Sequence, residues 1–339
     1  MSKNILVINF GGLGDEILFF PTLKSIKETY PDCKITLAIE PRSKACKDLT
    51  SYIDEVICVD IKSKYKYVEI IKFLLKVWQS KFDVVFSSGS SILVSVLLAL
   101  SLIKERYGFH SGLLSNILLT KTAKINKNQY AANMYHDLVK IVNPAARCTL
   151  PEINTLSSDF KVKSDKPVVL IHPGVSLMSV RKNIMKFWDE KRWAELIDKI
   201  LYDNNHTVVL AGGPDDKETV EKITSFMSND TEDFKNCYGK TKDISDLVSL
   251  ISNAAVMVCA DSAPLHMAVA LDTPVVAIFG PTDDKILLPE KDNIIVAVND
   301  ECECRPCLWA KRQVSCDERN CLDIKVDNVF EQVQRLLPR

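Results

Sequence analysis

Asp15 and the glycines around it are the residues near the N-terminus that are best suited to chemistry. Residues 4–9 are mostly apolar and lead into Gly11, Gly12 and Gly14, after which apolar residues recur at helical spacing. This pattern predicts a strand, a tight turn and a helix. Glycines let a ligand approach the backbone, and a helix start offers free N–H groups, so we expect Gly12 and Gly14 to bind an anion. Asp15 either takes part in chemistry here or only complements the helix dipole.

Two turns in the second half of the chain also carry groups that suit an anionic ligand. Arg181, Lys182 and Lys186 lie close together before a predicted helix. Such a cluster binds phosphate or an acidic group of a substrate, or is simply a solvated face. Gly212 and Gly213 follow a predicted strand. They permit close approach to a nucleotide, although a plain turn between strand and helix would have the same residues.

A third turn of the second half lies at ADSAPLHMAVA, residues 260–270. Asp261 and Ser262 stand where a helix is expected to begin, so their side chains and the free amides can hold a diphosphate. Helix capping alone is the alternative role. His266 lies one turn into the helix and either faces the same site or packs in the core.

The elements that position these residues alternate between strand and helix in both halves. Short apolar strands followed by amphipathic helices predict an α/β fold with two Rossmann-like, doubly wound parallel sheets. We expect domains at 1–160 and 161–324, with a polar linker near 157–166 and a last helix in 325–339 that packs back across the domains. In such sheets ligands bind at the carboxyl ends of the strands, where these turns lie.

Composition narrows the class of protein. The 339 residues carry a net charge of −1, which argues against a nucleic-acid binder that works by counterion release. The N-terminus has only a short apolar run, so we expect neither a signal peptide nor an anchor. Residues 92–103 form the longest apolar run, which is too short to span a bilayer. We expect a buried helix there rather than a membrane contact.

Five of the eleven cysteines fall within 302–321, and the others are scattered through apolar segments. The scattered ones are typical of buried thiols in a reducing cytosol. The terminal group can hold a structural zinc or iron ion through four thiolates, although the second pair is more widely spaced than a usual ligand pair. Disulfides or free thiols are the alternatives. The four candidate ligands are Cys304, Cys307, Cys316 and Cys321.

A nucleotide-dependent oxidoreductase is one competing interpretation. Glycines after the first strand and Glu40 at the end of a strand over 34–39 are similar to the layout that binds NAD, in which the acid holds a ribose. However, Ile17 occupies the place of the third glycine, where a bulky side chain hinders helix packing. A non-catalytic protein that binds nucleotide sugars is a further alternative.

The motifs taken together, in order along the chain, resemble glycosyltransferase family 9, the ADP-heptose:lipopolysaccharide heptosyltransferases. They are an LGD turn, an HPG turn, a K-x-W-x4-W segment, a GGP turn, a DS-x3-H helix start and FGPT. The resemblance implies a GT-B fold with an N-terminal acceptor domain, a C-terminal donor domain and a central cleft. It also implies transfer of heptose from an ADP-sugar with inversion and with no cofactor needed for catalysis.

The resemblance also implies roles for individual residues. Asp15 looks like the general base that deprotonates the attacking hydroxyl, and Lys186 like the lysine that neutralises the departing ADP. Asp261, Ser262 and Ala263 match the segment that contacts the donor diphosphate and sugar. His266 matches the family histidine, and Gly212 and Gly213 are expected near the nucleotide.

One departure from the family pattern concerns the donor. Glycine commonly follows the Asp-Ser pair, whereas this chain has Ala263 and Pro264, so ADP-heptose is the first of several possible donors. The expected acceptor is a lipid-linked saccharide of the lipopolysaccharide inner core, with a protein acceptor as the alternative. We expect a cytoplasmic enzyme, with peripheral contact to the inner membrane favoured by the basic residues near Arg181 and the apolar 92–103 segment.

Overall fold

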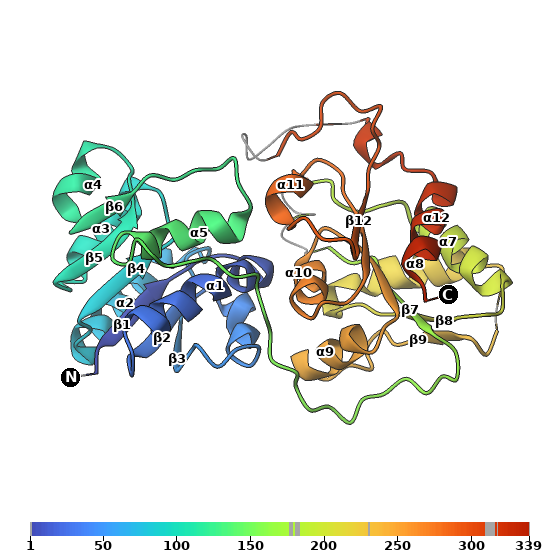
Figure 1. Ribbon diagram of the computed structural model, residues 1–339, viewed down its shortest axis with the longest axis horizontal. Helices are drawn as coiled ribbons and strands as arrows, with labels where there is room; N and C mark the ends of the chain where they lie inside the picture. Colours follow the sequence, from blue (N-terminus) through green and yellow to red (C-terminus); the bar gives the residue numbers. More distant parts are fainter. Residues whose placement is uncertain are drawn as a thin grey trace. The chain divides into compact units, whose positions relative to one another are not determined.

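The computed structural model describes residues 2–175, 179, 184–229, 231–308, 316 and 318–338. The chain divides into two compact units, Met1–Asn154 and Thr155–Arg339, which we call unit 1 and unit 2. Each unit has its own parallel sheet with helices (Figure 1).

Unit 1 contains a six-stranded parallel sheet in the order β3-β2-β1-β4-β5-β6. Its strands are β1 Asn4–Ile8, β2 Lys34–Ile39, β3 Glu55–Cys58, β4 Val84–Ser87, β5 Glu105–Phe109 and β6 Lys121–Ala123. Its helices are α1 Leu13–Thr29, η1 Pro41–Lys47, α2 Lys66–Ser80, α3 Ile92–Leu100, α4 Leu113–Leu118 and α5 Ala131–Lys140. The chain leaves β1 towards β2 and later returns to β4, so the sheet is doubly wound about β1 and β4.

Unit 2 repeats this plan with the order β12-β11-β10-β7-β8-β9. Its strands are β7 Val168–His172, β8 Thr207–Leu210, β9 Phe234–Asn236, β10 Val256–Ala260, β11 Val275–Ile278 and β12 Ile294–Ala297. Its helical segments are α7 Glu190–Tyr202, η2 Pro214–Asp216, α8 Lys217–Phe226, α9 Ile244–Ser252, α10 Ala263–Ala270, α11 Asp284–Leu287, η3 Asn320–Leu322 and α12 Val326–Leu336. The topological switch lies between β7 and β10, where a ligand site is expected.

The core of unit 2 is centred on two tryptophans of the K-x-W-x4-W segment. Trp188 and Trp193 are fully buried and meet edge to face, with ring centroids 5.1 Å apart. The Trp188 indole N–H donates to the carbonyl of Ile324, 3.2 Å away. The last helix, α12, packs on α7 and buries Val329 and Val333 in this core. These contacts fix the chain that directly follows Lys186.

Helix α3 differs from the sequence prediction, because it is not a buried helix. Only Ser95 and Leu98 are buried, whereas the side chains of Leu93 and Leu100 are 76% and 50% exposed. A helix that is apolar on every side still covers the sheet with one side only, and nothing among the described residues of unit 1 covers the other. Among the described residues, no helix is both long enough and apolar enough to cross a bilayer.

Candidate active site

The turn after β1 holds Asp15 in a defined position. Its Oδ2 accepts a hydrogen bond from the Gly12 N–H at 2.7 Å, the contact of a capping box. A Cβ at Gly11 would lie 2.3 Å from the Cβ of Asp15, so only glycine fits there. Asp15 therefore caps the helix through a hydrogen bond, a contact that goes beyond the interaction with the helix dipole expected from the sequence. Its side chain remains partly exposed, which leaves it accessible to a ligand.

Tyr135 of α5 lies beside this aspartate and was not singled out from the sequence. Burial raises the pKa of the Tyr135 hydroxyl well above its ordinary value, and the charge of Asp15 adds to the rise. The ring packs against Phe19, with centroids 5.4 Å apart. A neutral hydroxyl next to the carboxylate can donate a hydrogen bond to it. No local pattern marks Tyr135, because α1 and α5 meet only in the fold.

Glu16, the next residue, is fully buried. The Asn9 side-chain amide donates to its Oε2 at 3.0 Å. Burial raises the pKa of Glu16 well above its ordinary value, and the Asn9 hydrogen bond only partly opposes that rise. At a pH between the ordinary and the raised pKa, the Glu16 carboxyl is thus protonated in the folded state and ionised in the unfolded chain.

We expect Glu16→Gln to stabilise the fold increasingly as pH rises. Because the folded pKa lies above the unfolded one, wild-type stability falls above about pH 4.5, by up to about 1.4 kcal/mol per pH unit until the folded pKa is reached. Glutamine has no proton to lose. Urea unfolding near pH 5 and near pH 7 measures the effect, with Glu28→Gln on the exposed side of α1 as the control. Equal pH slopes for wild type and Glu16→Gln would contradict the prediction.

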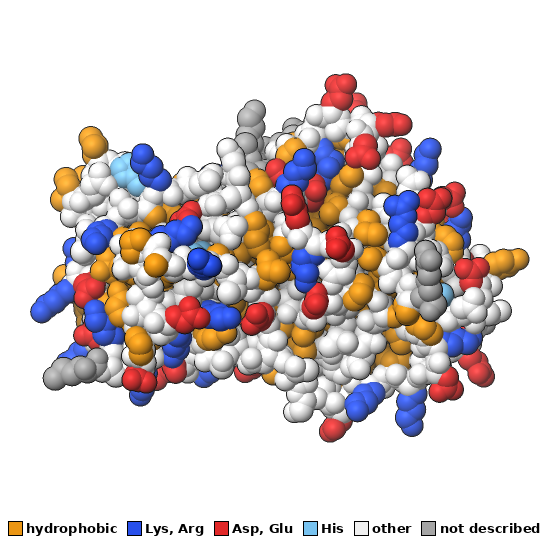
Figure 2. All heavy atoms as spheres, viewed as in Figure 1, with side chains coloured by type: hydrophobic (Ala, Val, Ile, Leu, Met, Phe, Trp, Pro, Cys, Tyr) orange, Lys and Arg blue, Asp and Glu red, His pale blue; other side chains and the backbone are white. Residues whose placement is uncertain are grey.

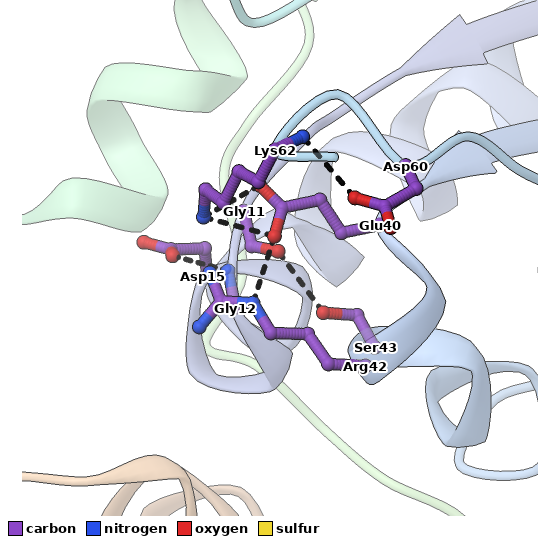
Figure 3. Close-up of polar contacts among 8 residues, drawn as sticks. All are labelled: Gly11, Gly12, Asp15, Glu40, Arg42, Ser43, Asp60 and Lys62. Carbon is purple, nitrogen blue, oxygen red and sulfur yellow. Dashed lines mark hydrogen bonds and ion pairs between the residues drawn. The ribbon is translucent and has the colours of Figure 1, made fainter. Parts of the chain in front are cut away.

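Glu40 at the end of β2 is paired with two cations. Its side chain is only 4% exposed, Arg42 Nε lies 2.8 Å from Oε2, and Lys62 Nζ lies 2.7 Å from Oε1. Figure 3 shows both basic side chains meeting at Glu40 beside the turn that carries Gly12 and Asp15. A carboxylate held in this way is not available for the ribose of NAD. The three residues instead leave one net positive charge near Asp15.

In unit 2 the central feature is a contact between Lys186 and Asp261. Lys186 Nζ lies 2.6 Å from Asp261 Oδ2, and the Thr282 hydroxyl donates to the same oxygen at 2.6 Å. Asp261 follows β10, and Lys186 lies between β7 and α7, so the pair sits at the topological switch. The Lys186 side chain is 19% exposed, so Lys186 is not part of a solvated face.

The charge state of Asp261 follows from these partners. Burial acts to raise its pKa, but the Lys186 ammonium and the hydrogen bonds from Lys186 and Thr282 outweigh burial. His266 adds in the same direction, and the net pKa is lowered. Asp261 is therefore a carboxylate at neutral pH.

Helix α10 begins directly after this pair. Ser262 is its N-cap residue, but its side chain makes no capping hydrogen bond, so the capping alternative does not hold for Ser262. Ala263 and Pro264 form the first turn, and Pro264 has no N–H to donate. His266 is buried. The early amides of α10 and the Lys186 side chain are thus the groups of this turn that chemically suit an anion.

The Gly212–Gly213 turn contains an unpredicted polar pair. The Gly213 N–H donates to Asp216 Oδ2 at 2.8 Å. Burial raises the pKa of Asp216 and lowers that of His172, while the charge of each opposes the shift of the other. A Cβ at Gly174 would lie 2.1 Å from Asp216 Oδ2. The HPG and GGP turns are therefore packed against one another through Asp216.

Arg305 was also missed from the sequence. Its Nε donates to the carbonyl of Gly280 at 2.8 Å, and its Nη2 lies 2.7 Å from Asp284. These contacts hold the FGPT loop, which carries Thr282. Gly14 lies in the first turn of α1. Arg181 and Lys182 lie outside the described residues.

The cysteines do not form the expected four-thiolate site. Among the described residues, no three His, Cys, Asp or Glu side chains are grouped so that they could hold a metal ion. All eleven cysteines are free. Cys321 is buried in the core of unit 2, and burial raises the pKa of its thiol to about 11. Cys302 and Cys304 are close, with sulfurs 3.3 Å apart.

The scattered cysteines follow the prediction in part. Cys33, Cys46, Cys237 and Cys259 are buried, whereas Cys58 is exposed and Cys148 is partly exposed.

Two doubly wound parallel sheets, with polar groups at the carboxyl ends of the central strands, define a GT-B fold. The sequence profile of glycosyltransferase family 9 (heptosyltransferase) matches residues 70–316. The chain belongs to this family and is a glycosyltransferase.

Two known proteins that resemble the chain are heptosyltransferases. Lipopolysaccharide heptosyltransferase 3 of Escherichia coli is 26% identical over 294 residues, which cover 83% of this chain and 85% of that protein. The structure of E. coli ADP-heptose lps heptosyltransferase II has a TM-score of 0.74 at 21% identity and covers 99% of this chain and 98% of its own.

A second similar structure contains iron and an ADP-sugar. It is the dodecameric iron-containing heptosyltransferase TibC of enterotoxigenic E. coli in complex with ADP-D-beta-D-heptose. It has a TM-score of 0.61 at 14% identity and covers 99% of this chain and 76% of its own. At that identity the likeness establishes the fold alone, and the cysteines of this chain do not fit a metal ion in the described residues.

Proposed function

We propose that this glycosyltransferase transfers heptose from ADP-heptose to a saccharide of the lipopolysaccharide inner core, with inversion. The names of the similar proteins support the sugar and the acceptor class. The Lys186–Asp261–Thr282 contact at the start of α10 is the observation that supports binding of the donor. A lysine and helix amides at one turn suit a diphosphate.

In the proposed reaction the Asp15 carboxylate takes the proton of the acceptor hydroxyl. The hydroxyl oxygen then forms a bond to the anomeric carbon of heptose while the bond from that carbon to the ADP oxygen breaks. Lys186 and the α10 amides stabilise the negative charge that builds up on the leaving ADP. A single displacement of this kind inverts the anomeric configuration and needs a base for the incoming alcohol.

The other expected residues take supporting roles in this proposal. Gly12 and Gly14 keep the turn at Asp15 open to the acceptor, as Gly212 and Gly213 do for the nucleotide. Asp261, Ser262, Ala263 and His266 surround the diphosphate and sugar, and Arg181 and Lys182 bind phosphate or an acidic acceptor group. No cofactor is required for this chemistry. We place the enzyme in the cytoplasm, at the membrane face that exposes a lipid-linked acceptor.

We expect Arg42→Ala and Lys62→Ala each to raise the KM for an anionic acceptor about tenfold, because each loses a charged hydrogen-bond donor beside Asp15. The KM for the donor should stay unchanged. Steady-state kinetics with both substrates varied measures this, with Lys44→Ala, an exposed lysine of the same short helix η1, as the control. A rise in donor KM alone would contradict an acceptor role for this pair.

Incubation with ADP-heptose and a lipid A–Kdo acceptor tests the proposal as a whole. We expect ADP release that depends on the acceptor, and a product heavier by one heptose. ADP release that occurs only with a protein acceptor would mean that the acceptor is a protein and not a saccharide. Tight binding of NAD with no response to ADP-sugars would favour an oxidoreductase. ADP binding without turnover on any acceptor would indicate a non-catalytic binder.

A further inference from the structure

The outer side of α2, α3 and α4 exposes an unusual number of apolar side chains. Of the 16 large apolar side chains that are exposed among the described residues, 13 lie within residues 65–117. We call this surface the α2–α4 face. Examples from its three helices are Trp78, Leu93 and Leu113, which are 47%, 76% and 83% exposed. Monomeric proteins rarely expose large contiguous apolar surface without a partner for it.

The three helices form one layer on the same side of the first sheet. Phe73 and Val77 of α2 share a core cluster with Leu98 of α3 and with the strands. The Trp78 indole N–H donates to the carbonyl of Leu100 at 3.0 Å, which joins α2 to the end of α3. Helices α3 and α4 are in contact and lie next to one another in Figure 1. Their outward apolar side chains therefore belong to a continuous surface.

A longer segment that contains these three helices carries a strong positive charge. Residues 61–127 contain 11 Lys and Arg against three Asp and Glu, and ten of the 11 are exposed lysines. Unit 1 as a whole has 20 basic and 14 acidic residues, whereas unit 2 has 23 and 30. Figure 2 shows Lys and Arg side chains spread over the visible surface of unit 1, at the left of the view.

The three acids of this stretch are already engaged. Glu69 pairs with Lys72 at 2.9 Å, Glu105 pairs with Lys3 at 2.9 Å, and Asp83 accepts from the Asn4 N–H at 2.8 Å. Lys64 and Lys66 lie over the rings of Tyr65 and Tyr67. The α2–α4 face thus combines protruding Leu, Ile, Trp and Tyr side chains with Lys64 and Lys66 beside its tyrosines, in a segment of the chain that has few acids.

We propose that the α2–α4 face docks onto an anionic phospholipid bilayer. Apolar side chains enter the boundary between headgroups and acyl chains, Trp and Tyr prefer that depth, and lysines contact anionic headgroups. Pairing of this face with the same face of a second copy would bring like charges together, so charge favours the bilayer. The inference extends the proposed function, because a lipid-linked acceptor lies at such a surface, but the binding can be measured without any transfer.

Sedimentation of the full-length protein with vesicles tests the proposal. We expect binding to phosphatidylcholine vesicles that contain about 30 mol% phosphatidylglycerol, little binding to phosphatidylcholine alone, and weaker binding at high salt. The triple substitution Leu93→Ser, Leu113→Ser and Ile117→Ser should weaken binding at least tenfold. Tyr202→Ser in unit 2, where the side chain is also 83% exposed, is the matched control and should not change it.

A variant with reversed charges tests the contribution of the lysines to vesicle binding. Lys64→Glu with Lys66→Glu should weaken binding more than tenfold, since each lysine near an anionic surface contributes about fivefold, whereas Lys240→Glu in unit 2 should not. All these side chains are exposed, so thermal unfolding should stay the same. Transfer to a water-soluble acceptor without vesicles should also stay the same.

Three results would overturn the proposal: no preference for phosphatidylglycerol vesicles, equal binding by wild type and the triple variant, or self-association that the triple variant abolishes while no vesicle binding occurs. The last result would make the face an interface between copies. Vesicle binding without transfer to any acceptor would support the membrane inference and contradict the proposed function, so the two are tested separately.

Discussion

Asp15→Asn is expected to lower kcat about 10³-fold while the KM for the donor stays near the wild-type value. General base catalysis typically contributes between about 10² and 10⁴ in rate, and asparagine cannot take the acceptor proton. The fold should survive, because the asparagine Oδ1 can still accept the Gly12 N–H that now bonds to Oδ2 at 2.7 Å. ADP release with saturating acceptor measures the change.

The control for this variant is another acid that caps a helix. Asp243 caps α9 through the Ser245 N–H at 2.9 Å, and asparagine is an equally good cap. Asp243→Asn should therefore keep nearly full activity. If Asp15→Asn also retained kcat within about threefold, Asp15 would act only as a cap, and the base would have to be sought elsewhere.

Lys186→Ala is expected to have the second large effect, with a loss of about 10² to 10³ in kcat, because one positive donor to the leaving diphosphate disappears. The substitution also leaves the buried Asp261 carboxylate, whose side chain is only 4% exposed, without its cationic partner. Removing one partner of a buried pair costs about 3–5 kcal/mol. Because the Thr282 hydrogen bond to Asp261 remains and Lys186 is partly exposed, we expect the loss of stability to lie at the lower end of this range.

The pH dependence of that cost has a defined sign. In the wild type the lowered pKa of Asp261 contributes stability above its ordinary pKa, which is lost as pH falls through the folded pKa. Without Lys186, burial raises the pKa of Asp261, so the variant loses stability as pH rises above the ordinary value. Urea unfolding should show a larger deficit near pH 7 than near pH 4.

A double variant separates the two roles of Lys186. Lys186→Ala with Asp261→Asn removes the stranded charge, so we expect most of the lost stability to return. Activity should not return, because the diphosphate still lacks its lysine. Recovery of activity together with stability would show that Lys186 serves the fold and not the leaving group.

Most of the fold could be predicted from local patterns, because parallel strands buried on both faces appear as short apolar runs. The strands expected over 4–9 and 34–39 contain β1 and β2. The strands that were missed, β6 and β9, are three-residue strands at the sheet edges. Edge strands so short leave no periodicity to detect, since pairing with a neighbour alone defines them.

The exposure of α3 could not be predicted, because its residues are apolar on every side. Periodicity shows which side of a helix is apolar, and a helix without a polar side gives no sign of its orientation. Only the placement of α2, α3 and α4 in one layer shows that Leu93 and Leu100 point away from the sheet.

The candidate site was predictable residue by residue but not in its contacts. Lys186 and Asp261 each lie at a recognisable turn, yet their 2.6 Å contact joins residues 75 positions apart. Thr282, Arg42, Lys62 and Arg305 escaped notice because a single polar residue after a strand is ordinary. Their position after the strands of a doubly wound sheet was the available signal.

The anomeric configuration of the newly attached heptose tests most directly whether the proposed transfer is a single displacement with Asp15 as the base. NMR of the product formed from ADP-heptose and a lipid A–Kdo acceptor measures it. We predict a heptosyl product whose anomeric carbon is inverted relative to the donor. A product with retained configuration, or no heptosyl product at all, would contradict a single displacement with Asp15 as the base.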